Sequence, residues 1–313
     1  MKKEAVTTLL EVSDLSITFT QYISGLRQRT IRAIINLSVN INHGEVLAIV
    51  GASGSGKSLL AHAILGILPG NACVDGKMVY AGELLTPARQ AALRGREIAL
   101  IPQSVNFLDP LMRVGAQVRS GIFNGNSTAL QREIFDRYHL AVGTEQLFPF
   151  QLSGGMARRV LVATAAVGSA RLIIADEPTP GLHPMIVRET LAHLRELSAT
   201  GSAVMLITHD ISAALETADR IAVFYAGTTV ETAPASDFCG DGELLRHPYS
   251  KALWQALPQN GFQPIDGSQP SIDNLPCGCL FAPRCSLASR DCLTTVPELR
   301  SLRGGETRCH HAA

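Results

Sequence analysis

The sequence predicts an α/β protein with a parallel sheet, an antiparallel β subdomain, a helical subdomain and a small cysteine-containing C-terminal module. Strand-sized apolar runs alternate with segments of helical periodicity through the middle of the chain, and this alternation is typical of a parallel sheet. The first forty or so residues instead alternate apolar and polar positions, which indicates antiparallel strands. Five of the seven cysteines follow the segment "QNGFQPIDGSQPSIDN", whose Pro and Gly content indicates a linker.

The predicted elements run along the chain from antiparallel strands to the parallel sheet. "LLEVSDLSITF" and "IINLSVNI" predict the antiparallel strands, and "GEVLAIVGASGSGKSLLAHAILGIL" predicts a strand, a turn and a helix. Residues 104–160 are mostly helical in pattern and are expected to form the helical subdomain. "RLIIADE" and "SAVMLITHD" then predict buried strands on either side of an amphipathic helix. We therefore expect a main domain, residues 1–245, and a C-terminal extension, residues 246–313.

Composition and charge exclude some classes of function. Lys plus Arg and Asp plus Glu both number 27, so the net charge is zero and nothing indicates a nucleic-acid partner. The N-terminal stretch lacks the apolar run of a signal peptide, and no apolar run approaches the roughly 18 residues of a membrane-spanning helix. We therefore expect a cytosolic protein whose membrane role would come through a partner.

A phosphate-binding loop is predicted at "GASGSGKS". The stretch matches the pattern G-x-x-x-x-G-K-S/T and lies after a strand and before a helix, as that motif requires. Its glycines let successive N–H groups and the helix N-terminus face phosphates. Lys57 would reach the β and γ phosphates, and the Ser58 hydroxyl would ligate Mg²⁺. The residues expected to bind the nucleotide are Gly51, Ser53, Gly54, Ser55, Gly56, Lys57 and Ser58.

Polar side chains at the ends of other predicted strands extend this site. Asp176 ends "LIIAD", where a carboxylate can hold the magnesium shell, and Glu177 suits a general base that polarises the attacking water. His209 follows "LIT" and can reach the γ-phosphate or orient the water. Gln103 follows "ALIP" and could ligate Mg²⁺ or position water. The alternative for the two adjacent acids is a solvated turn.

A second anion-binding helix N-terminus is predicted at "QLSGGMARRV", where Ser153, Gly154 and Gly155 precede a helix. One nucleotide does not need two such loops in one subunit. With the phosphate loop, "PQ", "LSGG", "IIADEP" and "THD" in this order, the sequence resembles the ATP-binding subunits of ATP-binding cassette (ABC) transporters. The resemblance implies an ABC-type P-loop ATPase in which "LSGG" of one subunit closes over the ATP held by another, so that hydrolysis requires a dimer.

Other stretches resemble the oligopeptide/dipeptide/nickel importers within that family. They are "RGREIALIPQSVNFLDPLMRVGAQV", the methionine after "LSGG", "HPYSKALWQALP" and a tail of the form "GCLFAPRC". This resemblance implies a peripheral protein at the cytoplasmic face of the membrane, which binds two permease subunits served by an extracellular substrate-binding protein. A groove beside the helical subdomain would receive the permease's coupling helices. A heterodimer with a second ABC ATPase is favoured over a homodimer, and peptide is the expected cargo, with nickel or a metal–chelator complex as the alternative.

Two positions depart from the family's pattern. "EPTPGLHP" places His183 where the family usually has an aspartate that communicates between the two ATP sites, so we expect a slower or asymmetric site. The aromatic residue that stacks on adenine in the family is matched best by Phe19, with Tyr22 as the alternative position. The alternative role for Phe19 is that of an ordinary core or exposed residue.

The tail cysteines leave several interpretations open. Four of them match the subfamily's tail and could hold a [4Fe-4S] cluster, bind zinc or remain unligated thiols, whereas the cytosol disfavours a disulfide. These four are Cys279, Cys285, Cys292 and Cys309. Cys277, Cys73 and Cys239 lie outside this set.

Two other classes of protein compete with a transporter subunit. A non-transport ABC ATPase of the DNA-repair or chromosome type would carry a coiled coil or a zinc insertion, which the sequence lacks, and neutral charge also disfavours DNA. An iron–sulfur redox protein would need a second cofactor motif beyond the short tail. We therefore expect ATP and Mg²⁺ as ligands, ATP hydrolysis as the reaction and no nucleic acid as a partner.

Overall fold

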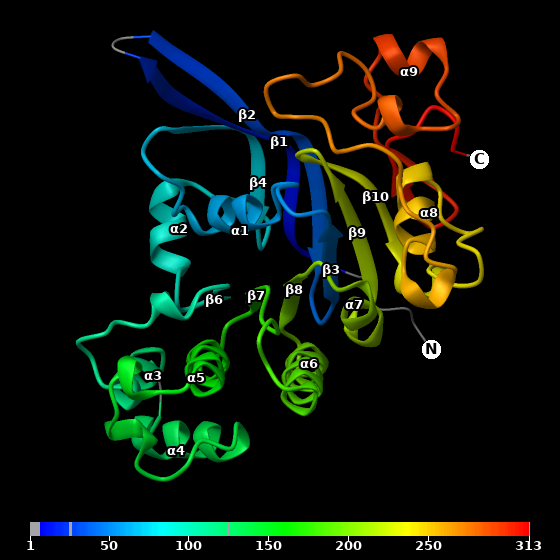
Figure 1. Cartoon of the computed structure of the whole chain (residues 1–313). Helices are drawn as coiled ribbons and strands as arrows, with labels where there is room; N and C mark the ends of the chain where they lie inside the picture. Colours follow the sequence, from blue (N-terminus) through cyan, green and yellow to red (C-terminus); the bar gives the residue numbers. More distant parts are fainter. Residues whose placement is uncertain (1–6, 25–26, 124, 313) are drawn as a thin grey trace.

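Two sheets organise the chain in this computed structural model, which describes residues 7–24, 27–123 and 125–312 (Figure 1). The smaller sheet is antiparallel and has the order β2-β1-β4-β5. Its strands are β1 (Thr8–Ser24), β2 (Arg27–Asn42), β4 (Ala72–Tyr80) and β5 (Glu83–Leu84). The predicted antiparallel β subdomain is therefore confirmed, and the larger sheet completes the predicted α/β fold.

The larger sheet has the order β11-β12-β10-β9-β3-β8-β7-β6, and its five strands from β9 to β6 are parallel. Its strands are β3 (Val46–Gly51), β6 (Ile98–Ile101), β7 (Leu172–Asp176), β8 (Ala203–Ile207), β9 (Arg220–Tyr225), β10 (Thr228–Pro234), β11 (Arg300–Leu302) and β12 (Gly305–Thr307). Every residue of β3, β7 and β8 is buried, which explains why these segments read as continuous apolar runs. Their carboxyl ends meet at one edge of the sheet, where α/β proteins bind ligands.

Helices cover the parallel strands and form a separate group beyond β6 and β7, where α3, α4 and α5 lie together (Figure 1). The helices are α1 (Lys57–Leu65), α2 (Pro87–Leu93), α3 (Val114–Ser120), α4 (Ser127–Arg137), α5 (Gly154–Ala166), α6 (Pro184–Ala199), α7 (Ile211–Thr217), α8 (Pro248–Gln255) and α9 (Arg290–Thr294). One apolar cluster joins α3, α4 and α5 to β6, β7 and α6, so this group packs against the main sheet.

The C-terminal segment is part of the larger sheet. Strand β12 pairs antiparallel with β10 through Glu231↔Thr307 and Thr232↔Glu306. Phe281 is buried against Tyr225 of β9, with their ring centroids 5.3 Å apart, and belongs to the same apolar cluster as β9 and β10. A separate cysteine-containing module is therefore not confirmed, because the segment shares both a sheet and an apolar core with the rest of the chain. Three-residue strands are too short to give a periodic signal in the sequence.

Candidate functional site

The phosphate loop connects the end of β3 to the start of α1 and borders a cavity of about 540 Å³, which we call the phosphate-loop cavity. Five of the residues predicted to bind the nucleotide line it, and they are Ser53, Gly54, Gly56, Lys57 and Ser58. Gly51 lies behind the cavity, where a Cβ atom would come within 2.3 Å of the Phe224 carbonyl oxygen. Ser55 is fully buried, and its hydroxyl has no hydrogen-bond partner within the described part of the chain.

Gly56 begins helix α1 in a left-handed conformation, with φ of 97°. Among the described residues no side chain caps this helix end, so its first N–H groups and the positive end of the helix dipole face the cavity. The Lys57 ammonium donates hydrogen bonds to the carbonyl oxygens of Gly51 (2.9 Å) and Ala52 (3.0 Å). Burial lowers the pKa of Lys57, and the nearby Glu177 and Asp176 partly oppose that shift. A loop of this composition fits a nucleotide's phosphates.

Asp176 lies at the end of β7 and faces the phosphate loop. The Ser58 hydroxyl donates a hydrogen bond to its carboxylate over 3.1 Å, although 118 residues separate the two in sequence. Burial raises the pKa of Asp176, while the bond from Ser58 lowers it. A hydroxyl and a carboxylate in contact are the oxygen ligands that Mg²⁺ prefers, so these residues fit a magnesium ion.

Glu177 and His209 lie side by side across the same cavity. Glu177 has a left-handed backbone with φ of 47°, and its N–H donates to the Ile207 carbonyl at the end of β8, over 2.9 Å. His209 Nδ1 lies 2.9 Å from both carboxylate oxygens of Glu177. The glutamate is buried, whereas the histidine side chain is 66% exposed and can meet a ligand. Gln103 also lines this cavity, so the structure brings together all three residues predicted to act in hydrolysis.

Arg158 is a residue of this site that the sequence analysis missed. It is buried on α5, and its guanidinium donates to the Pro102 carbonyl over 2.8 Å, next to Gln103. Burial lowers its pKa, and the charges of Asp176 and Glu177 oppose that shift. Arg158 therefore ties the Gln103 loop to α5 and adds positive potential near both acids. An arginine on the apolar face of a predicted helix is unusual, and this position could have indicated a buried role for Arg158.

The second predicted anion site lies apart from the phosphate-loop cavity. Ser153 caps α5 by accepting a hydrogen bond from the Met156 N–H over 3.3 Å, and Gly154 and Gly155 form the first turn of that helix. None of these three is among the described residues that line the cavity. Ser153 and Gly154 are exposed, so they are available to another molecule.

His183, Phe19 and Tyr22 also lie outside the described lining of the cavity. His183 caps α6, where its Nδ1 accepts a hydrogen bond from the Met185 N–H over 3.4 Å. Phe19 is half-buried and packs against the apolar core of the antiparallel sheet, and its stacking on adenine stays a prediction. Tyr22 is 66% exposed and accepts a hydrogen bond from Gln28.

The four tail cysteines do not form a site that fits a cluster or a zinc ion. The Cys279 N–H donates to the Cys292 carbonyl over 2.8 Å, so parts of the set are close. However, the described residues contain no group of three or more His, Cys, Asp or Glu side chains arranged to hold a metal. Burial raises the pKa of Cys279 to about 11 and also raises that of Cys285 and Cys309. The prediction of a [4Fe-4S] cluster is thus not supported.

In the described parts of the chain, no helix has both the length and the apolar character needed to cross a membrane.

Comparisons with known proteins agree with this geometry. The ABC transporter family matches residues 34–180, and the C-terminal region of oligopeptide/dipeptide transporters matches residues 230–292. The chain is similar to a dimeric ATP-binding cassette solved in a post-hydrolysis state with ADP and Pi, with a TM-score of 0.63 and 25% identity, over 72% of this chain and 99% of that one.

Curated relatives extend the similarity along most of the chain. The oligopeptide transport ATP-binding protein OppD of Mycobacterium tuberculosis is 37% identical over 93% of this chain, which spans only 50% of that relative's length. AppD of Bacillus subtilis, also an oligopeptide transport ATP-binding protein, is 34% identical over 97% of both chains. The dipeptide transport ATP-binding protein DppD of Haemophilus influenzae is 33% identical over 96% of this chain and 95% of its own. The chain therefore belongs to the ABC transporter family, among the oligopeptide and dipeptide transport ATP-binding proteins.

Proposed function

We propose that the protein is the ATP-hydrolysing subunit of an importer that takes up peptides. The observation that carries this proposal is the pair of contacts at the phosphate-loop cavity, Ser58 with Asp176 and Glu177 with His209. The first contact would hold Mg²⁺ beside the phosphates, and the second brings a carboxylate and an imidazole to the same cavity. Cleavage of the γ-phosphate depends on positioned charge and an aligned water more than on covalent chemistry.

Each group of residues at the cavity would have a separate role in hydrolysis. Backbone N–H groups at the start of α1 and the Lys57 ammonium would hold the β and γ phosphates. Glu177 would accept a proton from the attacking water, and His209 would orient that water or contact the γ-phosphate. Ser58, Asp176 and Gln103 would hold Mg²⁺, which supplies charge neutralisation to the phosphates when bound.

A second subunit would complete the site. Ser153 and Gly154 are exposed at the start of α5 and lie apart from the phosphate-loop cavity of their own chain. A partner's equivalent loop would supply the second helix N-terminus, and the similar solved cassette is dimeric. We favour an unlike ABC ATPase as that partner, since His183 makes this chain's own loop after Glu177 atypical.

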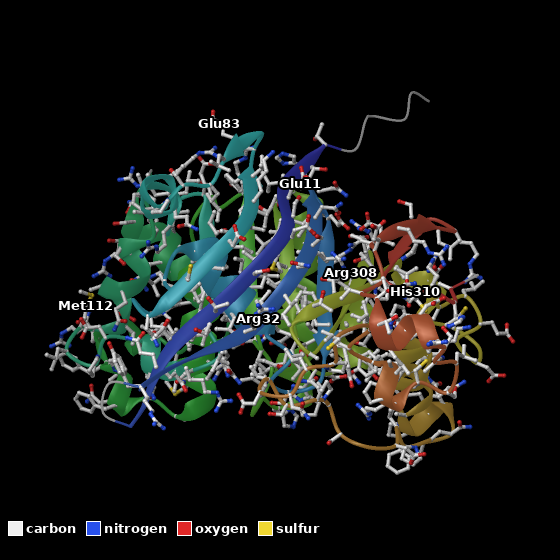
Figure 2. The ribbon with its side chains drawn as sticks, turned by 90° about the horizontal axis from the view of Figure 1, so that it is seen from above. Glu11, Arg32, Glu83, Met112, Arg308 and His310 are labelled. Carbon is white, nitrogen blue, oxygen red and sulfur yellow. The ribbon has the colours of Figure 1, made fainter. Side chains whose placement is uncertain are left out.

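The group formed by α3, α4 and α5 would contact two permease subunits at the cytoplasmic face of the membrane. A groove of about 370 Å³ there is lined by Val105, Leu108, Pro110, Phe150 and Ala157, among others. Large apolar side chains are exposed beside it, with Leu111 at 88% and Phe150 at 74%. An exposed apolar patch next to a groove is typical of a surface for a partner helix. Met112, the exposed neighbour of Leu111, lies far from the C-terminal tail (Figure 2).

Peptide is the proposed cargo because the relatives named above are oligopeptide and dipeptide transport proteins. Nickel, the alternative drawn from the sequence, has no comparable support. An extracellular binding protein would select the cargo, so the ATPase acts on it only indirectly.

The hydrolysis proposal is tested with Glu177→Gln. This change keeps the size of the side chain and removes its basicity, so ATP hydrolysis should fall by about 10²- to 10⁴-fold while nucleotide binding persists. Phosphate release measures the rate, and a fluorescent ATP analogue measures binding. Glu189→Gln, at a partly exposed position on α6 outside the described lining of the cavity, is the matched control. An unchanged rate in Glu177→Gln would contradict the assigned role.

Complementation tests how the dimer forms. Lys57→Ala should inactivate the phosphate loop, and Ser153→Arg should block the second loop. If two copies of this chain pair, mixing the two inactive variants restores one intact composite site and part of the ATPase activity. If the partner is an unlike subunit, as we propose, the mixture stays inactive and activity appears only when that subunit and the permeases are co-expressed.

A further inference from the structure

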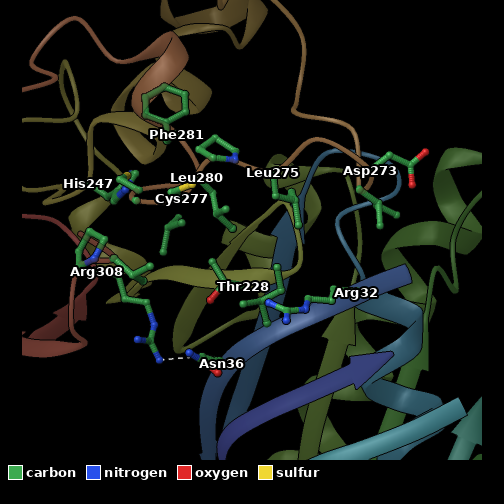
Figure 3. A pocket seen from close by; sticks show the side chains of 18 of the residues that line it. Arg32, Asn36, Thr228, His247, Asp273, Leu275, Cys277, Leu280, Phe281 and Arg308 are labelled. Carbon is green, nitrogen blue, oxygen red and sulfur yellow. Dashed lines mark hydrogen bonds between the residues drawn. The ribbon is translucent and has the colours of Figure 1, made fainter. Parts of the chain in front are cut away.

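A second cavity, of about 470 Å³, lies between β2, β10 and the C-terminal tail (Figure 3). We call it the tail cavity. Its apolar wall comes from Val230 of β10 and from Leu275, Leu280, Phe281 and Val296 of the tail. Its volume lies within the range of about 300–1,000 Å³ that small-molecule sites occupy, and such sites are mostly apolar with a few polar groups. The dimensions and the wall therefore suit a small organic ligand.

Three arginines line the tail cavity, and only one carboxylate does so among the described residues. Arg29 forms an ion pair with that carboxylate, Asp273. Arg32 is exposed on β2 and has no ion pair within the described ranges, while Arg308 points from the tail toward Asn36 (Figures 2 and 3). Arg308 in turn lies 3.6 Å from the carboxylate of Asp14, which is outside the lining, so Arg32 is the lining arginine without an ion pair among the described residues.

Arg308 is held rigidly at this cavity. It is 9% exposed, and its guanidinium donates to the Asn36 carbonyl over 2.7 Å and to the Ser38 hydroxyl over 3.3 Å. Its Nε is buried with no hydrogen-bond partner in the described segments. This guanidinium already faces the Asp14 carboxylate over 3.6 Å, so Arg308 shapes the wall of the cavity and Arg32 is the arginine free to meet an anion there.

The linker before the tail connects this cavity to the phosphate-loop cavity. Ile272 lines both cavities, and the next residue, Asp273, forms the ion pair with Arg29 on β2. A ligand that competes with Asp273 for the arginines, or that displaces Leu275 or Pro276, would act on residues close to Ile272 in the chain. Ligand binding in the tail cavity would therefore act on a segment that also borders the nucleotide site.

We propose that the tail cavity binds a small organic anion, with its carboxylate or phosphate near Arg32 and its apolar body against Leu280, Phe281 and Val296. Its occupancy changes the affinity of the phosphate loop for ATP through the linker at Ile272. Arginine suits this role because its planar, permanently charged fork pairs with both kinds of head group. The apolar wall selects ligands with a hydrocarbon body over inorganic anions.

Calorimetric titration of the full chain with octanoate tests the binding site. We expect binding with a Kd of about 1 mM or tighter, and no comparable binding of octylammonium or inorganic phosphate. Octyl phosphate in place of octanoate distinguishes a phosphate from a carboxylate head group. No binding of either octyl anion, or equal binding of octylammonium, would overturn the proposal.

Two variants locate the site. Arg32→Ala should weaken octanoate binding about tenfold, and Val296→Glu should abolish it by placing a carboxylate in the wall; both positions are exposed enough to tolerate the change. Arg27→Ala is the matched control, since Arg27 is exposed on the same strand and is not among the described lining residues. Equal loss in Arg27→Ala, or no loss in the first two variants, would contradict the assignment.

The link to the nucleotide is measured separately. The Kd of a fluorescent ATP analogue is determined with and without saturating octanoate, and by thermodynamic reciprocity ATP must change the octanoate Kd by the same factor. We expect a change of at least threefold that disappears in Arg32→Ala. An unchanged Kd refutes the coupling, and because octanoate binding needs no ATP hydrolysis, this result is independent of the proposed function.

Discussion

Glu231 on β10 anchors the segment that joins the ATP-binding part of the chain to its tail. Its side chain is fully buried and accepts hydrogen bonds from the backbone N–H groups of Arg246 and His247, each over 2.8 Å. The Arg246 guanidinium lies 3.3 Å from the same carboxylate and 2.8 Å from Asp237. This carboxylate therefore serves two backbone donors and one buried cation at once.

We predict that Glu231→Ala destabilises the protein by about 3 kcal/mol or more. The change leaves two buried N–H groups without acceptors, at about 1–3 kcal/mol each, and removes one of the two carboxylates that face Arg246. Breaking a buried ion pair by removing one partner costs about 3–5 kcal/mol, which agrees with this sum. The loss should be concentrated where α8 and the tail dock on β10.

The single tryptophan of the sequence, Trp254 on α8, is a built-in reporter for this prediction. It is 7% exposed, so its fluorescence should change when α8 leaves the sheet. Urea unfolding followed by this fluorescence gives the stability of wild type and variant. Glu243→Ala, an exposed acid in the same segment, is the control and should change little. A loss below about 1 kcal/mol in Glu231→Ala would refute the reasoning.

Three further predictions concern the phosphate loop, the tail and the loop after Glu177. Gly51→Ala should lower the free energy of unfolding by about 2 kcal/mol or more and weaken ATP binding, because the new Cβ would lie 2.3 Å from the Phe224 carbonyl oxygen. Gly54→Ala, whose Cβ would meet no atom within 4 Å, should lower the stability less in the same thermal unfolding measurement. Burial lowers the pKa of His247 to about 3, so between pH 6.5 and about 3 the unfolded chain binds more protons than the folded one, and stability should fall as the pH drops through that range. His247→Asn retains a helix cap and cannot take up that proton, so unfolding titrations should show a weaker dependence of stability on pH. His183→Asp should change the ATPase rate of the assembled dimer, and an unchanged rate would refute a role for this position.

Most of the features that the sequence predicted correctly depend on residues that are close together in the chain. The phosphate loop needs a strand, a Gly/Ser turn and a helix in succession, and all three are contiguous between Val46 and Leu65. Asp176, Glu177 and His209 were placed correctly at one edge because parallel strands share the direction of their carboxyl ends. The common direction of the parallel strands was thus enough to predict that these side chains, from separate sequence patterns, lie close together.

Features that depend on contacts distant in sequence were missed or remain unassigned. Arg158 reaches Pro102 across 56 residues, and no local pattern marks that pairing. Phe19 suits either a stacking or a core role, and its partial packing against the antiparallel sheet leaves one part of the ring free for either. The tail cysteines have spacing without the three-dimensional arrangement of a metal site in the described residues.

The stretch "HPY" at residues 247–249 fixes the position of α8 on the larger sheet. His247 caps α8 by accepting a hydrogen bond from the Tyr249 N–H over 3.0 Å, and Pro248 occupies the first helical position, where its missing N–H costs nothing. Tyr249 is thereby fixed beside Tyr225 of β9, with ring centroids 4.5 Å apart. Burial raises the pKa of Tyr249 to about 12, and a hydrogen bond from the backbone of Ala52 opposes that rise. Ala52 is part of the phosphate loop, so Tyr249 brings α8 close to the loop that borders the nucleotide site.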